Sequence, residues 1–174
     1  MTIEAKRTPI EIEEALKFSI KEAENFGDQS VIVKTQNKLA HWLMTDRRYE
    51  EAIPLFRNIA QFQELHHDDR LAHSFHMLSS CLSHQDDSEN LREGIEFAEK
   101  AFQLYGDSEE HTESKKSTVA LQVSILYNLS QKTKNKDYAE KIKKVYKKHQ
   151  SLFNGKNDKD FKGVVEELEA TQLA

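Results

Sequence analysis

The stretch LAHWLMTDRRYEEAIPLFRNIA, residues 39–60, consists of two segments with helical spacing joined by a short polar break at residues 46–48. Apolar residues that recur every three or four positions mark one face of an α-helix, and both segments show that spacing. The residues that form the two faces are Leu39, Ala40, Leu43, Ala52, Phe56 and Ile59. The stretch therefore predicts two helices that pack against each other in antiparallel orientation.

The same pattern recurs along the chain. The counterparts of Ala52, Phe56 and Ile59 lie 42 residues later and are Gly94, Ala98 and Ala101. Residues 78–82 repeat the first half of the pattern, and residues 13–16 repeat residues 50–53 at a distance of 37. A period of this length is typical of proteins built from stacked helical repeats.

The small residues of the pattern have a structural purpose. A small residue on the first helix, Ala40 or Ser79, faces another on the second, Ala52 or Gly94, so two antiparallel helices can approach closely. The larger residues then project toward the next helix pair. Because a single pair cannot bury its own apolar face, the pairs are expected to stack.

Residues 39–60 resemble a tetratricopeptide repeat, with Tyr49 as the large residue of the turn and Ala52 as the small residue of the second helix. The resemblance implies an all-α fold, an antiparallel helix-pair solenoid of about eight helices with a C-terminal capping helix. The single domain 1–174 would comprise a leading helix (8–27), repeat one (30–65), repeat two (70–105), repeat three (114–153) and the cap (158–172). Ser30 is expected to cap the helix that opens repeat one. The register of the third repeat stays open because the small residue expected near Lys141 is absent, and other helix-pair solenoids fit the same spacing.

The resemblance also implies a function. In such solenoids the first helices of the pairs line a concave groove that holds a peptide or another protein, on the side facing away from the partner helix. The matching positions here are Lys34, Asn37 and His41 in repeat one and His73, His76, Ser80 and His84 in repeat two. The expected function is a non-catalytic scaffold or adaptor, and similar arrays include regulators that respond to a short peptide. A solvated polar surface is the alternative interpretation of these side chains.

Composition agrees with a helical chain. Five glycines and two prolines are roughly a third of average usage, too few for a turn-rich β-sandwich or barrel. No apolar run approaches the roughly 20 residues of a membrane span, and residues 1–14 lack the apolar core of a signal peptide. Cys81, the one cysteine, cannot form an intrachain disulfide and is expected in the core. These features predict a cytoplasmic protein.

Charge is distributed unevenly. Eleven lysines face four acidic residues within 131–162, whereas residues 163–174 carry three glutamates and no lysine. Because the chain as a whole has a net charge of −5, it lacks the basic surface expected of a nucleic-acid-binding domain. The lysines are expected to cover the solvent side of an amphipathic helix. The C-terminal helix is expected to cap the array, with homodimerisation through that helix as the alternative.

Catalytic motifs are sparse. His67-Asp68, with His41 upstream, is similar to the His-Asp pair of helical metal-dependent phosphohydrolases, so such a hydrolase is the alternative function. His73 and His76 would share one helix face, but no carboxylate follows at the spacing that would complete a metal site. No phosphate-binding loop, nucleophile elbow or His-Glu-x-x-His motif occurs. The sequence therefore predicts neither a metal nor a cofactor.

Overall fold

The computed structural model describes residues 8–153, and the predicted cap at 158–172 lies outside that range. Seven α-helices and two short 3-10 helices make up these residues, and no strand occurs among them. The helices are α1 (Pro9–Phe26), α2 (Gln29–Thr45), α3 (Tyr49–Leu65), α4 (Leu71–Leu82), α5 (Ser88–Leu104), η1 (Glu109–His111), α6 (Thr112–Thr133), α7 (Asp137–His149) and η2 (Gln150–Phe153). The all-α prediction is confirmed for the part of the chain that the structure describes.

Local signals set the first helix boundaries. The Thr8 side chain accepts a hydrogen bond from the backbone N–H of Glu11, and the Glu11 carboxylate accepts one from the Thr8 N–H in return. Gly27 ends α1 with a φ of 68°, a left-handed conformation that glycine adopts without strain. The turn is so short that Asp28, not Ser30, caps α2 by accepting from the Val31 N–H at 3.1 Å.

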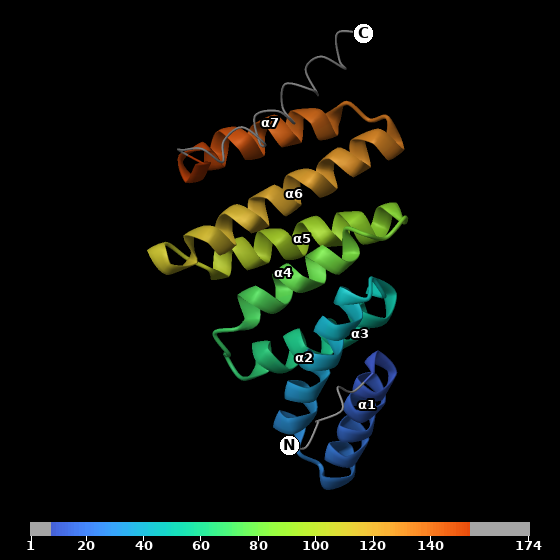
Figure 1. The fold of residues 1–174 in the computed structure, drawn as a ribbon. Helices are drawn as coiled ribbons and strands as arrows, with labels where there is room; N and C mark the ends of the chain where they lie inside the picture. Colours follow the sequence, from blue (N-terminus) through green and yellow to red (C-terminus); the bar gives the residue numbers. More distant parts are fainter. Residues whose placement is uncertain (1–7, 154–174) are drawn as a thin grey trace, which may run out of the picture. The chain divides into compact units, whose positions relative to one another are not determined.

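The chain divides into two compact units, Met1–Asp69 and Arg70–Ala174. In the first unit, α2 packs against both α1 and α3. In the second unit, α4 to α7 pack in chain order, each against the next, as Figure 1 shows from green to orange. Packed antiparallel neighbours of this kind agree with a helix-pair architecture.

Small residues lie where the paired helices are closest, as the sequence predicted. Ala40 and Ala52 have no exposed surface in the α2–α3 pair. In the α4–α5 pair, the Ser79 hydroxyl donates a hydrogen bond of 2.7 Å to the carbonyl oxygen of Gly94. A Cβ added at Gly94 would lie 3.3 Å from the Leu82 Cβ, so the backbone of α5 reaches α4 directly.

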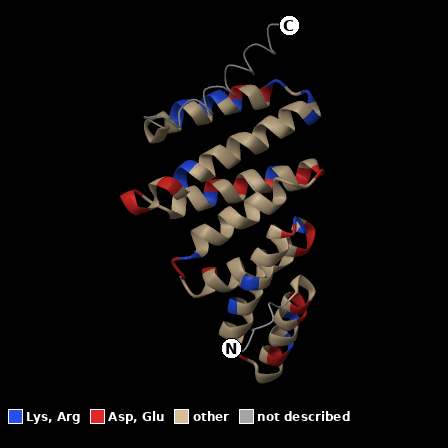
Figure 2. Ribbon diagram, in the orientation of Figure 1, with Lys and Arg blue, Asp and Glu red and all other residues tan. Residues whose placement is uncertain are grey.

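Large side chains fill the third pair instead. Leu129 and Ile142 are completely buried in the core cluster of α5, α6 and α7, and Tyr138 is 8% exposed. Ile125 of α6 is also completely buried and lies against Gly94 of α5. A small residue is nevertheless present, because Ala139 of α7, two positions before Lys141, is 2% exposed. Lysines recur along α7, as Figure 2 shows, and Lys141 and Lys144 are exposed whereas Tyr138 and Ile142 are buried, so the expected amphipathic helix is confirmed.

An ion-pair network joins α1 to the turn between α2 and α3. The Arg48 guanidinium donates to both carboxylate oxygens of Glu13, with Nη2 to Oε1 at 3.1 Å, and to both oxygens of Glu51. These hydrogen bonds, together with one from Lys17, lower the pKa of Glu13 to about 2. The bidentate geometry fixes the orientation of α1 against its neighbours within the first unit.

None of the helices in residues 8–153 combines the length and apolar character needed to cross a membrane. The Cys81 thiol is fully buried, and burial raises its pKa to about 12. The expectation that Cys81 is a core residue is therefore confirmed.

Candidate functional site

Four of the predicted groove residues form a strip along α4. His73, His76, Ser80 and His84 follow one another at intervals of three or four residues, which places them on the same side of the helix. The opposite side is buried and includes Phe75, Leu78 and Leu82. His73 and His84 are exposed, and His76 and Ser80 are half-buried.

His76 connects this strip to α6. Its Nδ1 lies 2.9 Å from the Thr118 hydroxyl, and that hydroxyl lies 2.8 Å from the carbonyl oxygen of Ser114. Since a carbonyl can only accept, Thr118 donates to Ser114 and accepts from His76. The His76 proton is therefore on Nδ1, which leaves Nε2 as a hydrogen-bond acceptor. Burial, followed by the charge of His73, lowers the pKa of His76 and keeps the ring neutral near pH 7.

His84 is held by the last turn of the same helix. Its Nδ1 lies 2.8 Å from the carbonyl oxygen of Ser80, so Nδ1 carries the proton in this ring as well. The Ser83 hydroxyl donates to the same carbonyl at 2.7 Å. These two bonds fix the imidazole at the end of α4, where the chain turns toward α5.

A hollow of about 490 Å³ lies beside His84. It is bounded by the α4–α5 turn, one residue of α5 and the C-terminal half of α6. The lining residues are Ser83, His84, Gln85, Asp86, Leu91, Asn128, Gln131 and Lys132. Of the four α4 residues predicted from the sequence, His84 alone belongs to it.

The chemistry of this hollow is polar and mixed in charge. Three side-chain amides, each with donors and an acceptor, line the hollow and belong to Gln85, Asn128 and Gln131. The Lys132 ammonium and the Asp86 carboxylate lie 3.8 Å apart, and both side chains remain exposed. Leu91, 2% exposed, adds an apolar surface. Amides over an apolar surface suit the backbone and side chains of a peptide.

The remaining predicted groove residues belong to α2 in the first unit. Lys34 is exposed and Asn37 is half-buried. The His41 ring meets the Phe56 ring edge-on at 5.4 Å between centroids. His41 thus packs against α3, its partner helix, which corrects the expectation that it points away from that helix. The structure groups the α2 residues within one unit and the α4 residues within the other.

The residues of the alternative hydrolase do not assemble into a metal centre. His67 lies in the turn after α3 with a φ of 52° and is exposed, while His41 packs on Phe56. Within residues 8–153, no group of three or more His, Cys, Asp or Glu side chains is placed to hold a metal ion. The donor set that such a hydrolase needs is not formed by these residues.

Sequence reasoning missed the α6 side of the hollow. Asn128 and Gln131 belong to a run of exposed residues that also includes Ser117, Ala120 and Ser124. Their spacing of three or four residues is present in the sequence, but the open register of the third pair left that face of α6 unassigned. A polar stripe opposite Val119, Val123 and Leu126 was the available signal.

No protein-family model matches the chain, and no curated protein matches it.

The second unit is expected to lose stability as the pH falls from about 7 to about 5. Burial is the main cause that lowers the pKa of His76 and His149 below the ordinary value of 6.5. Lys148 and Lys115 lower the pKa of His149 further. Below 6.5 the unfolded chain binds protons that the folded chain does not, so folding weakens as the pH falls. Thermal unfolding followed by circular dichroism across this range measures the effect.

The stability of the first unit should not change over the same pH range, so this unit is the internal control. The lowered pKa of Glu13, about 2 against an ordinary 4.5, gives stability that is complete above pH 4.5 and is lost only below it. Fluorescence of Trp42, the one tryptophan of the chain, reports on this unit. A circular dichroism midpoint that stays constant between pH 7 and about 5, or that rises on acidification, would contradict the prediction.

Proposed function

We propose that this chain is a non-catalytic protein- or peptide-binding scaffold of the tetratricopeptide type. The first helices of the pairs, α2, α4 and α6, carry the contact residues. The observation that carries the proposal is the polar hollow of about 490 Å³ at the ends of α4 and α6, next to His84. A superhelix formed by the stacked pairs and closed by a cap at 158–172 is part of the proposal.

The crossing geometry supports the assignment to this class. The Ser79–Gly94 hydrogen bond and the complete burial of Ala40 and Ala52 reproduce the close approach that defines such helix pairs. The His76–Thr118 bond connects two helices, α4 and α6, that both come first in their pairs. Neighbouring first helices would thus present one continuous surface within the second unit.

The polar lining supports a peptide as the ligand. A peptide segment carries alternating donors and acceptors, which the amides of Asn128 and Gln131 can satisfy in either direction. Lys132 and Asp86 would add charged contacts at the rim. A regulator that responds to a short peptide is the special case of this function that the hollow suits best.

Replacing Gln131 with arginine is expected to weaken peptide binding at least about tenfold, because the longer charged side chain fills the hollow. Peptides would first be selected from a random-sequence display library against the wild-type full chain. The selected peptides would then be synthesised and their dissociation constants measured by isothermal titration calorimetry.

The matched control is Gln103→Arg, which adds the same side chain at an exposed position of α5 outside the hollow. It should leave the dissociation constant unchanged. If Gln131→Arg binds the selected peptides as tightly as Gln103→Arg does, the hollow is not the binding site. A library from which no peptide is enriched would argue against peptide binding altogether.

A further inference from the structure

Apolar and acidic side chains alternate along an exposed ridge on the surface of α1. Ile10, Glu14, Phe18, Glu22 and Phe26 are each four residues apart, so their side chains form one row along the helix surface. The three apolar members are 70%, 64% and 83% exposed, respectively. Ala23, the buried residue of this helix, lies beside the C-terminal half of the row.

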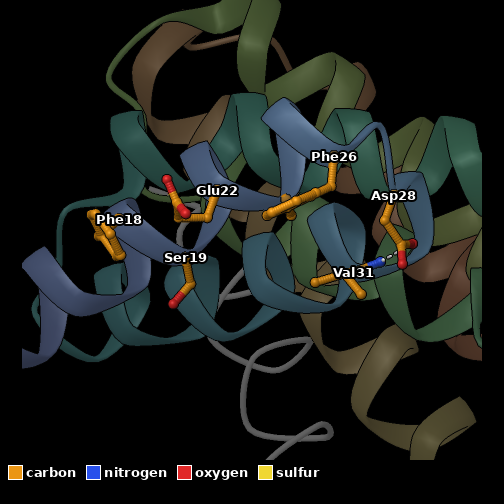
Figure 3. Close-up of a pocket in the computed structure, with 7 residues that line it drawn as sticks. Phe18, Ser19, Glu22, Phe26, Asp28 and Val31 are labelled. Carbon is orange, nitrogen blue, oxygen red and sulfur yellow. Dashed lines mark hydrogen bonds between the residues drawn. The ribbon is translucent and has the colours of Figure 1, made fainter.

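The C-terminal half of this ridge borders a hollow of about 410 Å³. Figure 3 shows Glu22 and Ser19 between Phe18 and Phe26, with Asp28 and Val31 contributed by the start of α2. The hollow therefore has aromatic walls at both ends and carboxylates beside it. We call the residues Ile10, Glu14, Phe18, Ser19, Glu22, Phe26, Asp28 and Val31 the α1–α2 patch.

Apolar exposure is concentrated here. Six large hydrophobic side chains are exposed among the described residues, and Ile10, Phe18, Phe26 and Val31 are four of them. Single exposed hydrophobic residues are ordinary, but a contiguous group around a hollow is typical of an interaction site. The patch is therefore expected to be covered by a partner.

The charges of the patch indicate the chemistry of that partner. Glu14, Glu22 and Asp28 are acidic, whereas the neighbouring exposed cations of α1 are Lys21 and Lys17, which is paired with Glu13. Asp28 Oδ1 accepts from the Val31 N–H at 3.1 Å and Glu22 Oε1 accepts from the Asn25 amide at 3.5 Å. Both contacts are hydrogen bonds with neutral groups, so within residues 8–153 neither carboxylate has an ion-pair partner.

We propose that the α1–α2 patch binds a basic amphipathic segment of another protein. Bulky apolar side chains of that segment enter the hollow between Phe18 and Phe26, and its lysines or arginines pair with Glu22 and Glu14. Phe18 and Phe26 lie eight residues apart, about 12 Å along the helix axis. A partner helix with apolar residues every fourth position and basic residues between them matches the ridge in both spacing and charge.

Three other occupants match less well. The segment 154–174 of this chain carries five acidic residues against three lysines, so it would bring a net negative charge onto the patch. Two copies of the patch facing each other would likewise oppose Glu14 and Glu22 to carboxylates. Helix α7 is basic, but its bulky residues Tyr138 and Ile142 are buried.

The proposal is tested with a synthetic fluorescein-labelled helical peptide that has leucine at every fourth position, lysines beside the leucines and alanine elsewhere. Fluorescence anisotropy would be measured on the full chain at about 0.15 M salt, where general attraction between exposed charges is screened. We expect saturable binding that weakens at least about tenfold for Phe26→Asp and for Glu22→Lys. A peptide with glutamate in place of every lysine should bind at least about tenfold more weakly than the basic peptide.

The matched control is Leu104→Asp, which places the same charge at another exposed leucine, 52% exposed on α5. It should bind the basic peptide as the wild type does, and Glu22→Lys should bind the acidic peptide better than the wild type does. Equal binding of both peptides, or binding unaffected by Phe26→Asp, overturns the proposal. Self-association that Phe26→Asp abolishes would assign the patch to a second copy instead. The peptide hollow proposed above lies in the other unit, so Gln131→Arg should not affect this binding.

Discussion

Replacing Phe56 with alanine is expected to lower the free energy of unfolding by about 3–5 kcal/mol, the usual cost of removing a buried aromatic side chain. Phe56 has no exposed surface and lies in α3 at the centre of its contact with α2. The substitution also removes the edge-on contact with His41 at 5.4 Å. Urea denaturation followed by Trp42 fluorescence measures the loss in the unit that contains both helices.

The control is the same substitution at an exposed site. Phe18 is 64% exposed, so Phe18→Ala should change the free energy of unfolding by no more than about 0.5 kcal/mol. If the two variants lost equal stability, the α2–α3 interface would not be the core of this unit. A His41→Ala variant with a loss well below that of Phe56→Ala would agree with a packing residue at the edge of that core.

The sequence predicted helix ends and close helix pairs where residues near one another in the chain, or a repeated spacing, determine them. Thr8 and Gly27 begin and end α1 as predicted because a capping side chain and a left-handed glycine act over a few residues. The small pairs, Ala40 with Ala52 and Ser79 with Gly94, also predicted which helices lie closest. Such signals depend on neighbours in the chain or on a repeated spacing.

Other features, such as the start of α2, could not be predicted because the sequence offers two residues suited to the same role. Ser30 and Asp28 are both good capping residues, and Asp28 caps α2 because the turn at Gly27 closes within a single residue. In the third pair, the small buried residue of α7 is Ala139, two positions before Lys141, so the sequence pattern left the register open. The register, and with it the α6 wall of the polar hollow, became visible only from the packing.

The candidate sites were partly predictable for the same reason. Helical spacing placed His73, His76 and Ser80 on one strip of α4, and His84 follows in the turn after that helix. Spacing could not show that Phe18 and Phe26 are exposed, because exposure depends on which helices pack around α1. Nor could it show that His41 turns toward Phe56, a choice made by the side-chain rotamer.

Replacing Gly94 with valine is expected to destabilise the second unit by about 3 kcal/mol, near the upper end of the usual cost of overpacking. A Cβ at this position would lie 3.2 Å from Ile125 Cδ1, 3.3 Å from Leu82 Cβ and 3.5 Å from the Ser79 carbonyl oxygen. The Ile125 methyl can rotate away, but the Leu82 Cβ and the Ser79 carbonyl move only with the backbone of α4. Valine adds two further methyl groups there and would displace α5 from α4.

Gly94→Ala separates the steric effect from helix propensity. Alanine favours the helix by about 1 kcal/mol over glycine, which offsets part of the crowding, so the loss should be well below that of valine. Glu96→Val, at an exposed position of the same helix, controls for the valine itself and should cost at most about 0.7 kcal/mol. Urea denaturation followed by circular dichroism ranks the three variants.

Gly94→Val should also stretch the 2.7 Å bond from Ser79 to the Gly94 carbonyl and distort the nearby end of α4. Peptide binding in the His84 hollow should therefore weaken in parallel with stability. A Gly94→Val protein as stable as Glu96→Val would mean that the two helices are not in close contact, and the tetratricopeptide assignment would lose its principal support.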